Sequence, residues 1–213
     1  MTVHANRQET TTHRLEGRVL RDAFGTFPSG VVTVAGRVGG QLLGIAASSF
    51  TSISLEPALV SFSVAKASNT WPALRDAEQL GISVLADHHD ALCRQLAGPA
   101  GHRFDGLALH TSPEGAVLLD EAVATFTCTI EQEVEAGDHV IVVLRVSEVS
   151  AEGDRAPLVF HRSGFQRLHR DDLDPSRLDG RINGEAVDTG GEDADPADTT
   201  DQHRKDKTGE HAA

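Results

Sequence analysis

The chain lacks several features that would point directly to a function. It has no tyrosine and one tryptophan, so a tyrosine general acid is excluded. Its two cysteines, Cys93 and Cys128, are too few for a disulfide framework or a cysteine zinc site. No apolar run approaches the ~20 residues that span a bilayer, and the polar N-terminus has no apolar segment typical of a secretory signal.

Basic residues are also scarce, with 19 Lys and Arg against 32 Asp and Glu, a net charge of −13. A nucleic-acid binder needs a basic surface to displace counterions from phosphates, and a polybasic membrane-surface protein needs one for anionic lipids. The charge therefore argues against both classes. We expect a cytoplasmic protein with reduced thiols that binds neither nucleic acid nor membrane.

Most of the excess negative charge lies beyond Asp171, in a segment rich in Asp, Gly and Thr that has almost no large apolar residues. Such a segment cannot bury enough surface to offset the entropy lost on ordering. We expect residues 1–14 and 170–213 to be disordered, and residues 15–169 to form one domain.

Within this domain the patterns favour strands over helices. Gly39-Gly40 separates two apolar runs and predicts a hairpin. Further strands are expected at 57–64, 81–85, 121–134, 139–149, 157–161 and 165–168, and short helices at 15–24, 69–77 and 89–96. The first of these helices is amphipathic. Strands joined in this way pair antiparallel, and six or more close economically as a barrel.

The segment Ala46–Ser54 is the first candidate site, because it leaves a predicted strand and is rich in small hydroxyl residues. Small side chains let a flat ligand approach the backbone and its N–H groups. The alternative is a strand exit whose hydroxyl groups bond to their own backbone.

The segment Lys66–Pro72 is the second candidate. Ser68, Asn69 and Thr70 are typical N-cap residues, and Trp71-Pro72 open the predicted helix. Free N–H groups at a helix start, together with the charge of Lys66, would suit a phosphate. The alternative is plain capping, with Lys66 in solvent.

The third candidate is His139, which follows a predicted tight turn at Gly137-Asp138. A fixed ring at this position could serve a site, or it could be a surface histidine. His88, His89 and His161 have no metal-ligand partner at a useful spacing, so we expect no metal site. No phosphate-loop or GxGxxG pattern occurs either, which excludes a Rossmann nucleotide site.

Six segments together are more specific than any one of them. These are Arg21–Val34, Gly44–Val60, Ser68–Pro72, Arg103–Gly106, Ala136–His139 and Pro157–Arg162. In this order they resemble the short-chain flavin reductase family, the reductase components of two-component flavin-dependent monooxygenases. The resemblance covers about residues 16–168.

The resemblance implies an antiparallel split β-barrel that binds FMN or FAD, takes hydride from NADH or NADPH, and is usually a homodimer. It places the flavin ring at Ser48, Ser49, Phe50 and Thr51, and the phosphate at Lys66, Ser68, Asn69 and Thr70. Trp71 would pack beside this loop, and Arg103 and Phe104 would lie near the flavin. His139 would lie by the nicotinamide, and the segment Phe160, His161 and Arg162 would contact the nucleotide.

The chain departs from the family pattern near its end, where His161-Arg162-Ser163 replaces a frequent Tyr-Arg-Gly, and Phe165 replaces a tyrosine. These changes concern the nucleotide more than the flavin. Two rival functions remain. A flavin storage or sensing protein would not need the His139 turn, and an oxidase of the pyridoxamine-phosphate type usually places more arginines on its phosphate than the single Lys66 found here.

Overall fold

The structure is a computed structural model, and it describes residues 16–151 and 155–168. The predictions made for residues 1–14 and 170–213 fall outside the described residues. The helices are α1 (Gly17–Phe24), α2 (Trp71–Leu74), α3 (Asp90–Leu96) and the short 3-10 helix η1 (Ala100–His102). None of the described helices has the length and apolar character needed to cross a membrane.

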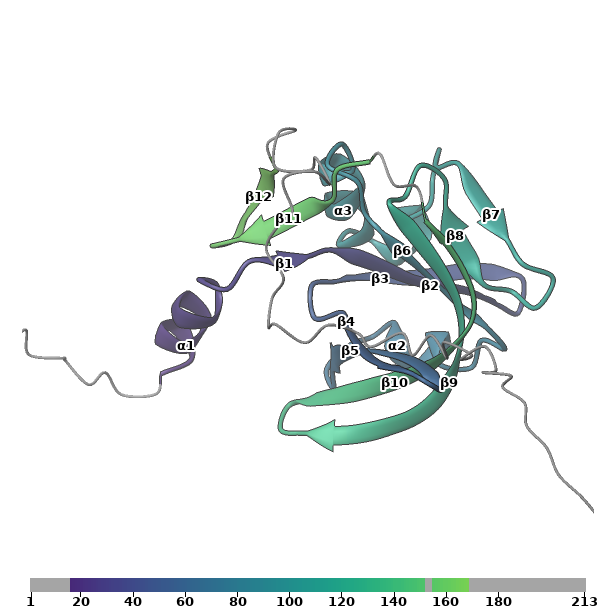
Figure 1. Ribbon diagram of the computed structural model, residues 1–213, viewed down its shortest axis with the longest axis horizontal. Helices are drawn as coiled ribbons and strands as arrows, with labels where there is room; N and C mark the ends of the chain where they lie inside the picture. Colours follow the sequence, from purple (N-terminus) through teal and green to yellow (C-terminus); the bar gives the residue numbers. More distant parts are fainter. Residues whose placement is uncertain (1–15, 152–154, 169–213) are drawn as a thin grey trace, which may run out of the picture. The chain divides into compact units, whose positions relative to one another are not determined.

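Strands make up most of the regular structure, as Figure 1 shows. They are β1 (Ser29–Gly30), β2 (Val32–Val38), β3 (Gln41–Ala47), β4 (Thr51–Leu55), β5 (Ala58–Ala65), β6 (Leu80–Val84), β7 (Leu109–Thr111), β8 (Val117–Leu119), β9 (Ala124–Ala136), β10 (His139–Ala151), β11 (Leu158–His161) and β12 (Gly164–Arg167). Seven of them form one antiparallel sheet in the order β3-β2-β6-β9-β10-β5-β4. The mainly β, antiparallel class predicted from the sequence is confirmed.

Turn chemistry sets the register of the two main hairpins. Gly39 and Gly40 join β2 to β3 with φ of 57° and 82°, a left-handed conformation that glycine adopts without strain. Gly137, at φ 62°, lies in the turn between β9 and β10. The two long strands shift register twice along their length, and such bulges bend a sheet and increase its twist.

The two edge strands of the seven-stranded sheet are joined by the short segment 48–50, since β3 ends at Ala47 and β4 begins at Thr51. Ser49 follows β3, which is at one edge, while Ser63 lies in β5, near the other edge. The Ser49 hydroxyl accepts the Ser63 N–H at 2.8 Å and donates to the Ser63 carbonyl at 3.1 Å. The sheet therefore curls on itself, which is the arrangement expected of a split barrel.

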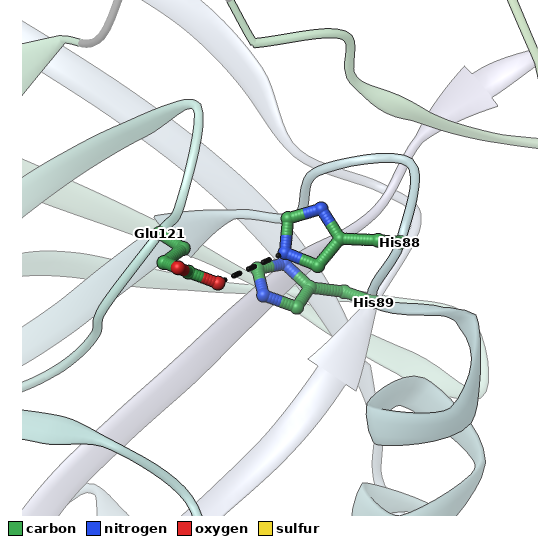
Figure 2. A group of neighbouring side chains, drawn as sticks. All are labelled: His88, His89 and Glu121. Carbon is green, nitrogen blue, oxygen red and sulfur yellow. Dashed lines mark ion pairs between the residues drawn. The ribbon is translucent and has the colours of Figure 1, made fainter.

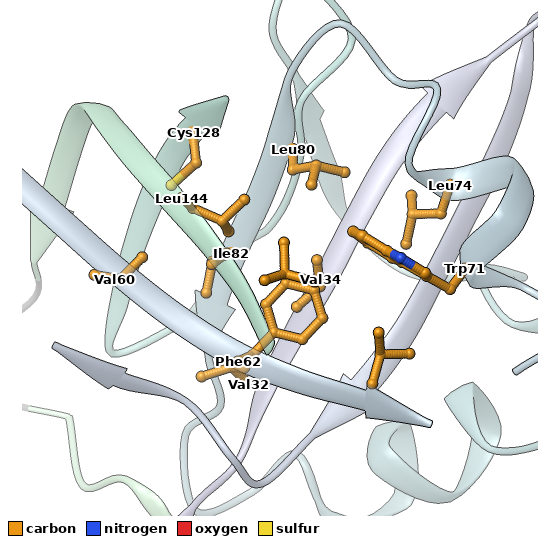
Figure 3. Packing of buried hydrophobic residues seen from close by; sticks show 12 residues of the cluster. Val32, Val34, Val60, Phe62, Trp71, Leu74, Leu80, Ile82, Cys128 and Leu144 are labelled. Atoms are coloured by element: carbon orange, nitrogen blue, oxygen red, sulfur yellow. The ribbon is translucent and has the colours of Figure 1, made fainter. Parts of the chain in front are cut away.

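The main core fills the inside of this curled sheet. Figure 3 shows side chains from β2, β5, β6, β9 and β10 packed together with Trp71 and Leu74 of α2. The rings of Phe62 and Trp71 meet edge to face, with centroids 5.4 Å apart. Because Trp71 is buried against β5, the loop that precedes it is held close to the end of that strand.

A smaller sheet, in the order β1-β11-β12, packs on a second apolar cluster that contains Val31, Leu85, Leu119 and Leu158. The polypeptide enters β11 beside β6, since the Asp87 N–H donates to the Ala156 carbonyl at 2.9 Å. This sheet brings the C-terminal part of the domain next to Ser29 and Gly30, at the start of the chain's β structure.

Two predicted helices differ from the structure. The helix predicted over 69–77 is regular at Trp71–Leu74, after which the chain continues in turns bonded from residue i to i+3. The amphipathic helix predicted at 15–24 forms as α1, but none of its side chains is buried. Its apolar face, including Phe24, is therefore exposed in the protomer.

Candidate functional site

The predicted ring-binding residues lie together in one cavity. Ser48, Ser49, Phe50 and Thr51 share a cavity of about 760 Å³ with Phe160 of β11; we call it the Ser48 cavity. Strand β3 ends just before these residues and β4 begins at Thr51, so the segment is an irregular stretch between two edge strands. Ser48 and Ser49 are exposed, while the Phe50 ring packs against Phe126 with centroids 5.7 Å apart.

The opposite wall of the Ser48 cavity was not predicted from the sequence. Arg21 and Phe24 of α1, together with Phe27 and Pro28, line it. The sequence shows only that Phe24 and Phe27 flank a Gly-Thr pair, whereas the structure singles them out because they are strongly exposed, at 70% and 77%. Aromatic residues so exposed in a domain with few aromatics often mark a binding surface.

Of the predicted phosphate residues, Lys66 and Ser68 line a second cavity of about 460 Å³ together with Trp71, whereas Asn69 and Thr70 do not line it; we call it the Lys66 cavity. Lys66 Nζ lies 3.1 Å from a carboxylate oxygen of Glu135, so this side chain is not free in solvent. The Ser68 hydroxyl accepts the N–H groups of Thr70 and Trp71 at 3.3 and 3.2 Å. Ser68 therefore holds the turn that leads into α2, whose N-cap residue is Thr70, and Asn69 is exposed beside it.

Two carboxylates of β9 complete the Lys66 cavity. Besides Glu135, Glu133 accepts the indole N–H of Trp71 at 2.9 Å and forms an ion pair with Arg75. Neither contact could be predicted from the sequence, because Glu133 lies 62 residues from Trp71 and 58 residues from Arg75. The cavity thus holds two cations and two anions.

Three hydrogen bonds to the protein hold the Arg103 side chain. Its guanidinium group donates to the carbonyls of Gly98 and Gly44 at 3.0 and 2.8 Å, and to the Thr70 hydroxyl at 2.8 Å. Phe104, the next residue, packs tightly against Gly44 and borders a separate pocket of about 410 Å³. These two residues hold β3 and the Thr70 loop in place.

His139 lies beside the Lys66 cavity without lining it. The Lys66 N–H donates to the Asp138 carbonyl at 2.9 Å, which fixes the turn next to the loop. His139 Nδ1 lies 2.8 Å from the Asp138 carboxylate, and this hydrogen bond lowers the pKa of Asp138. Because a carboxylate can only accept, the Nδ1–H of His139 donates to Asp138, and in the neutral form of the ring Nε2 is then the acceptor.

His161 and Arg162 line neither cavity. Arg162 and Ser163 form the turn between β11 and β12, with φ of 49° and 62°, and the Arg162 N–H donates to the Gly25 carbonyl at 2.8 Å. Ser163 borders the Ser48 cavity. Of the segment predicted to contact the nucleotide, only Phe160 lines this cavity.

A cluster of His88, His89 and Glu121 corrects one reading of the sequence, which found no metal-ligand partner for the two histidines. Figure 2 shows Glu121, from the turn between β8 and β9, directed at both rings, and potential ligand atoms of all three residues lie within 4.8 Å of one another. However, the Ala86 N–H donates to His89 Nδ1 at 3.0 Å, which places the proton of the neutral ring on Nε2. Burial lowers the pKa of His89 and so favours this neutral form. The hydrogen bond opposes metal binding through Nε2, and the absence of a metal stays a prediction.

Comparisons with known proteins identify the family of the domain. Residues 24–169 match the model of the flavin reductase like domain. The chain belongs to this family. It is 32% identical over 158 residues to a flavin reductase of Pseudomonas putida, covering 74% of this chain and 93% of the relative.

Two further relatives differ in length and function. The reductase component of the flavin-dependent trigonelline monooxygenase of Acinetobacter baylyi is 38% identical over 149 residues, which cover 70% of this chain but 48% of the relative. The NADH:FAD oxidoreductase of Streptomyces globisporus, solved in complex with NAD and FAD fragments, has a TM-score of 0.68 and 34% identity, over 73% of this chain and 94% of that protein. The family, the split-barrel class and the flavin reductase activity expected from the sequence are thus confirmed.

Proposed function

We propose that this flavin reductase oxidises NADH or NADPH, reduces FMN or FAD as a diffusible substrate, and releases the product to a separate flavin-dependent monooxygenase. The observation that carries the proposal is the Ser48 cavity, which lies inside the family-matched domain and is lined by small hydroxyl residues. Its volume lies within the range of ~300–1,000 Å³ that is usual for small-molecule sites.

The Ser48 cavity suits a flat ring with polar edges. Phe50 and Phe160 offer apolar walls, and Ser48 and Thr51 leave their backbone approachable. When bound, the flavin ring supplies the redox chemistry, and the protein supplies binding and orientation. We assign Ser49 a supporting role, because its hydroxyl is already engaged with Ser63.

The Lys66 cavity suits the phosphate end of the flavin. Lys66 contributes a charge, and Ser68, Asn69 and Thr70 provide polar groups on one loop. The buried Trp71 anchors this loop through Phe62 and Glu133. Arg103 acts on the same loop from behind, through Thr70, so we propose a positioning role for it in place of direct flavin contact.

His139 is proposed to orient the nucleotide. Its Nε2 acceptor is accessible, because the side chain is 46% exposed, and it could accept the carboxamide N–H of a nicotinamide. Phe160 would contact the same ligand from the Ser48 cavity, while His161 and Arg162 shape the turn that follows it. No protein nucleophile is needed for hydride transfer.

A homodimer is proposed from the exposed apolar side chains of the protomer. Leu55 and Ile53 on the edge strand β4 are 96% and 49% exposed, and Val149 on β10 is 66% exposed. Phe24 and Phe27, which both line the Ser48 cavity, are also strongly exposed, and a second copy of the chain would cover some of these apolar side chains. A cytoplasmic location remains a proposal that rests on composition.

The test is an assay of the purified full chain with each flavin and each nucleotide. We expect loss of NADH or NADPH absorbance that depends on added flavin and that increases with flavin concentration. If the preparation contains no bound flavin and the rate of NADH or NADPH oxidation does not depend on added flavin, the proposal is contradicted. Tight co-purifying flavin without nucleotide oxidation would instead support a storage or sensing protein.

A further inference from the structure

Both basic side chains of the Lys66 cavity are already paired with carboxylates of β9. Lys66 Nζ lies 3.1 Å from Glu135, and Arg75 forms an ion pair with Glu133. A phosphate that enters this cavity therefore meets no excess of positive charge. It must take Lys66 away from Glu135, or share it with that carboxylate.

The two carboxylates differ in how firmly they are held. Glu133 is 20% exposed and also accepts the indole N–H of Trp71, so it is part of the framework of the loop. Glu135 is 83% exposed, and its carboxylate bonds to Lys66 alone among the described residues. Exposed ion pairs of this kind contribute little to stability, so Glu135 can be displaced without cost to the fold.

We propose that Glu135 keeps the affinity for phosphorylated flavin low by competing with the phosphate for Lys66. The inference rests on the proposed function, in which flavin is a substrate that must leave after each turnover. The Glu135 carboxylate repels the phosphate, and it also pairs with the Lys66 ammonium group that would otherwise bind the phosphate. Both effects favour dissociation of the flavin.

The test is the variant Glu135→Gln, which keeps the size of the side chain and removes its charge. FMN and riboflavin are titrated separately into the purified full chain, and binding is followed by the change in flavin fluorescence. Since riboflavin has the same ring without the phosphate, it isolates the phosphate contribution. We expect the Kd for FMN to fall about threefold to tenfold at low salt, and most of this increase in affinity to disappear at high salt. The Kd for riboflavin should stay unchanged.

Glu131→Gln is the matched control. Glu131 lies on the same strand, and the substitution changes the net charge by the same amount, but its carboxylate pairs with Arg145 at 2.8 Å and does not line the Lys66 cavity. We expect the Kd for FMN to change by less than about twofold in this variant, because the effect of a distant exposed charge is screened.

An unchanged or higher Kd for FMN in Glu135→Gln would overturn the inference. An equal gain for riboflavin, or an equal gain in Glu131→Gln, would also overturn it, because neither result involves competition for Lys66. The binding titration does not depend on turnover. If FMN binding tightens as expected but the wild-type chain oxidises no nucleotide, the proposed function fails and the role of Glu135 stands.

Discussion

Replacing Arg103 by methionine tests whether this residue positions the flavin loop or contacts the flavin. The substitution keeps the length and the apolar part of the side chain and removes three hydrogen bonds, to the carbonyls of Gly98 and Gly44 and to the Thr70 hydroxyl. All three acceptors are then left without their partner at a half-buried position.

The expected loss of stability follows from these contacts. A hydrogen bond from a charged donor contributes about 1.5–3 kcal/mol when buried, and partial access of water to these acceptors reduces this to about 1 kcal/mol each. We therefore expect the free energy of unfolding to fall by about 2–4 kcal/mol. For a domain of this size that corresponds to a Tm lower by about 5–12 °C.

The assay combines thermal denaturation with FMN and riboflavin titrations. A positioning role predicts that Arg103→Met lowers the Tm and weakens FMN binding, and that Arg103→Lys restores only part of either, because one ammonium group cannot reach all three acceptors. Arg37→Met is the control, since Arg37 is exposed on β2 and its side chain bonds to none of the described residues. A Tm unchanged from wild type, with FMN binding lost in the methionine variant and kept in the lysine variant, would refute the reasoning and favour direct contact with the phosphate.

Three further outcomes follow from the geometry. In anaerobic stopped-flow measurements, His139→Ala should slow flavin reduction by NADH about tenfold, which corresponds to the loss of one hydrogen bond. The flavin Kd should stay unchanged. If neither the reduction rate nor the nucleotide affinity changes, His139 is a surface residue without a role in the site. Burial raises the pKa of Cys128 to about 12, so at pH 8 only about one thiol in 10⁴ is ionised. An alkylating reagent should therefore label Cys128 only when the protein unfolds, and rapid labelling of the native protein would contradict this. Gly44→Ala places a Cβ 2.5 Å from the Phe104 ring and 3.0 Å from the Ala35 side chain. In denaturant titrations it should lower the free energy of unfolding by about 1–3 kcal/mol. Gly101→Ala is the control and should leave this free energy unchanged, because Gly101 has open space around it.

The sequence predicted the strands because their signals are local. The glycine pair at Gly39-Gly40, the alternation along β9 and the β-branched run of β10 each specify an element within about a dozen residues. Four short strands were not predicted, namely β1, β4, β7 and β8, which have two, five, three and three residues. Thr127 and Cys128 are neighbours on β9 and both are buried, so β9 is covered on both faces at this point.

The site was predictable only where its residues are neighbours in sequence. Ser48–Thr51 lie in one cavity as expected, since four consecutive residues cannot move far apart. The contacts of Lys66 with Glu135 and of Arg103 with Thr70 join residues 69 and 33 positions apart. Such contacts depend on which strands pair, and a single sequence does not encode strand order in any local pattern. For that reason the sequence analysis could place Arg103 near the flavin but could not predict which groups its side chain contacts.

The exposed helix α1 has a consequence for hydrogen exchange. Isolated helices shorter than about 12–15 residues are marginal in water, and α1 has eight residues and buries no side chain of its own. In a free protomer its amide protons should therefore exchange with deuterium almost as fast as those of an unfolded peptide. If the second copy proposed above covers Val19 and Phe24, protection of these amides should rise with protein concentration. Exchange at α1 would then report the monomer–dimer equilibrium without an attached probe.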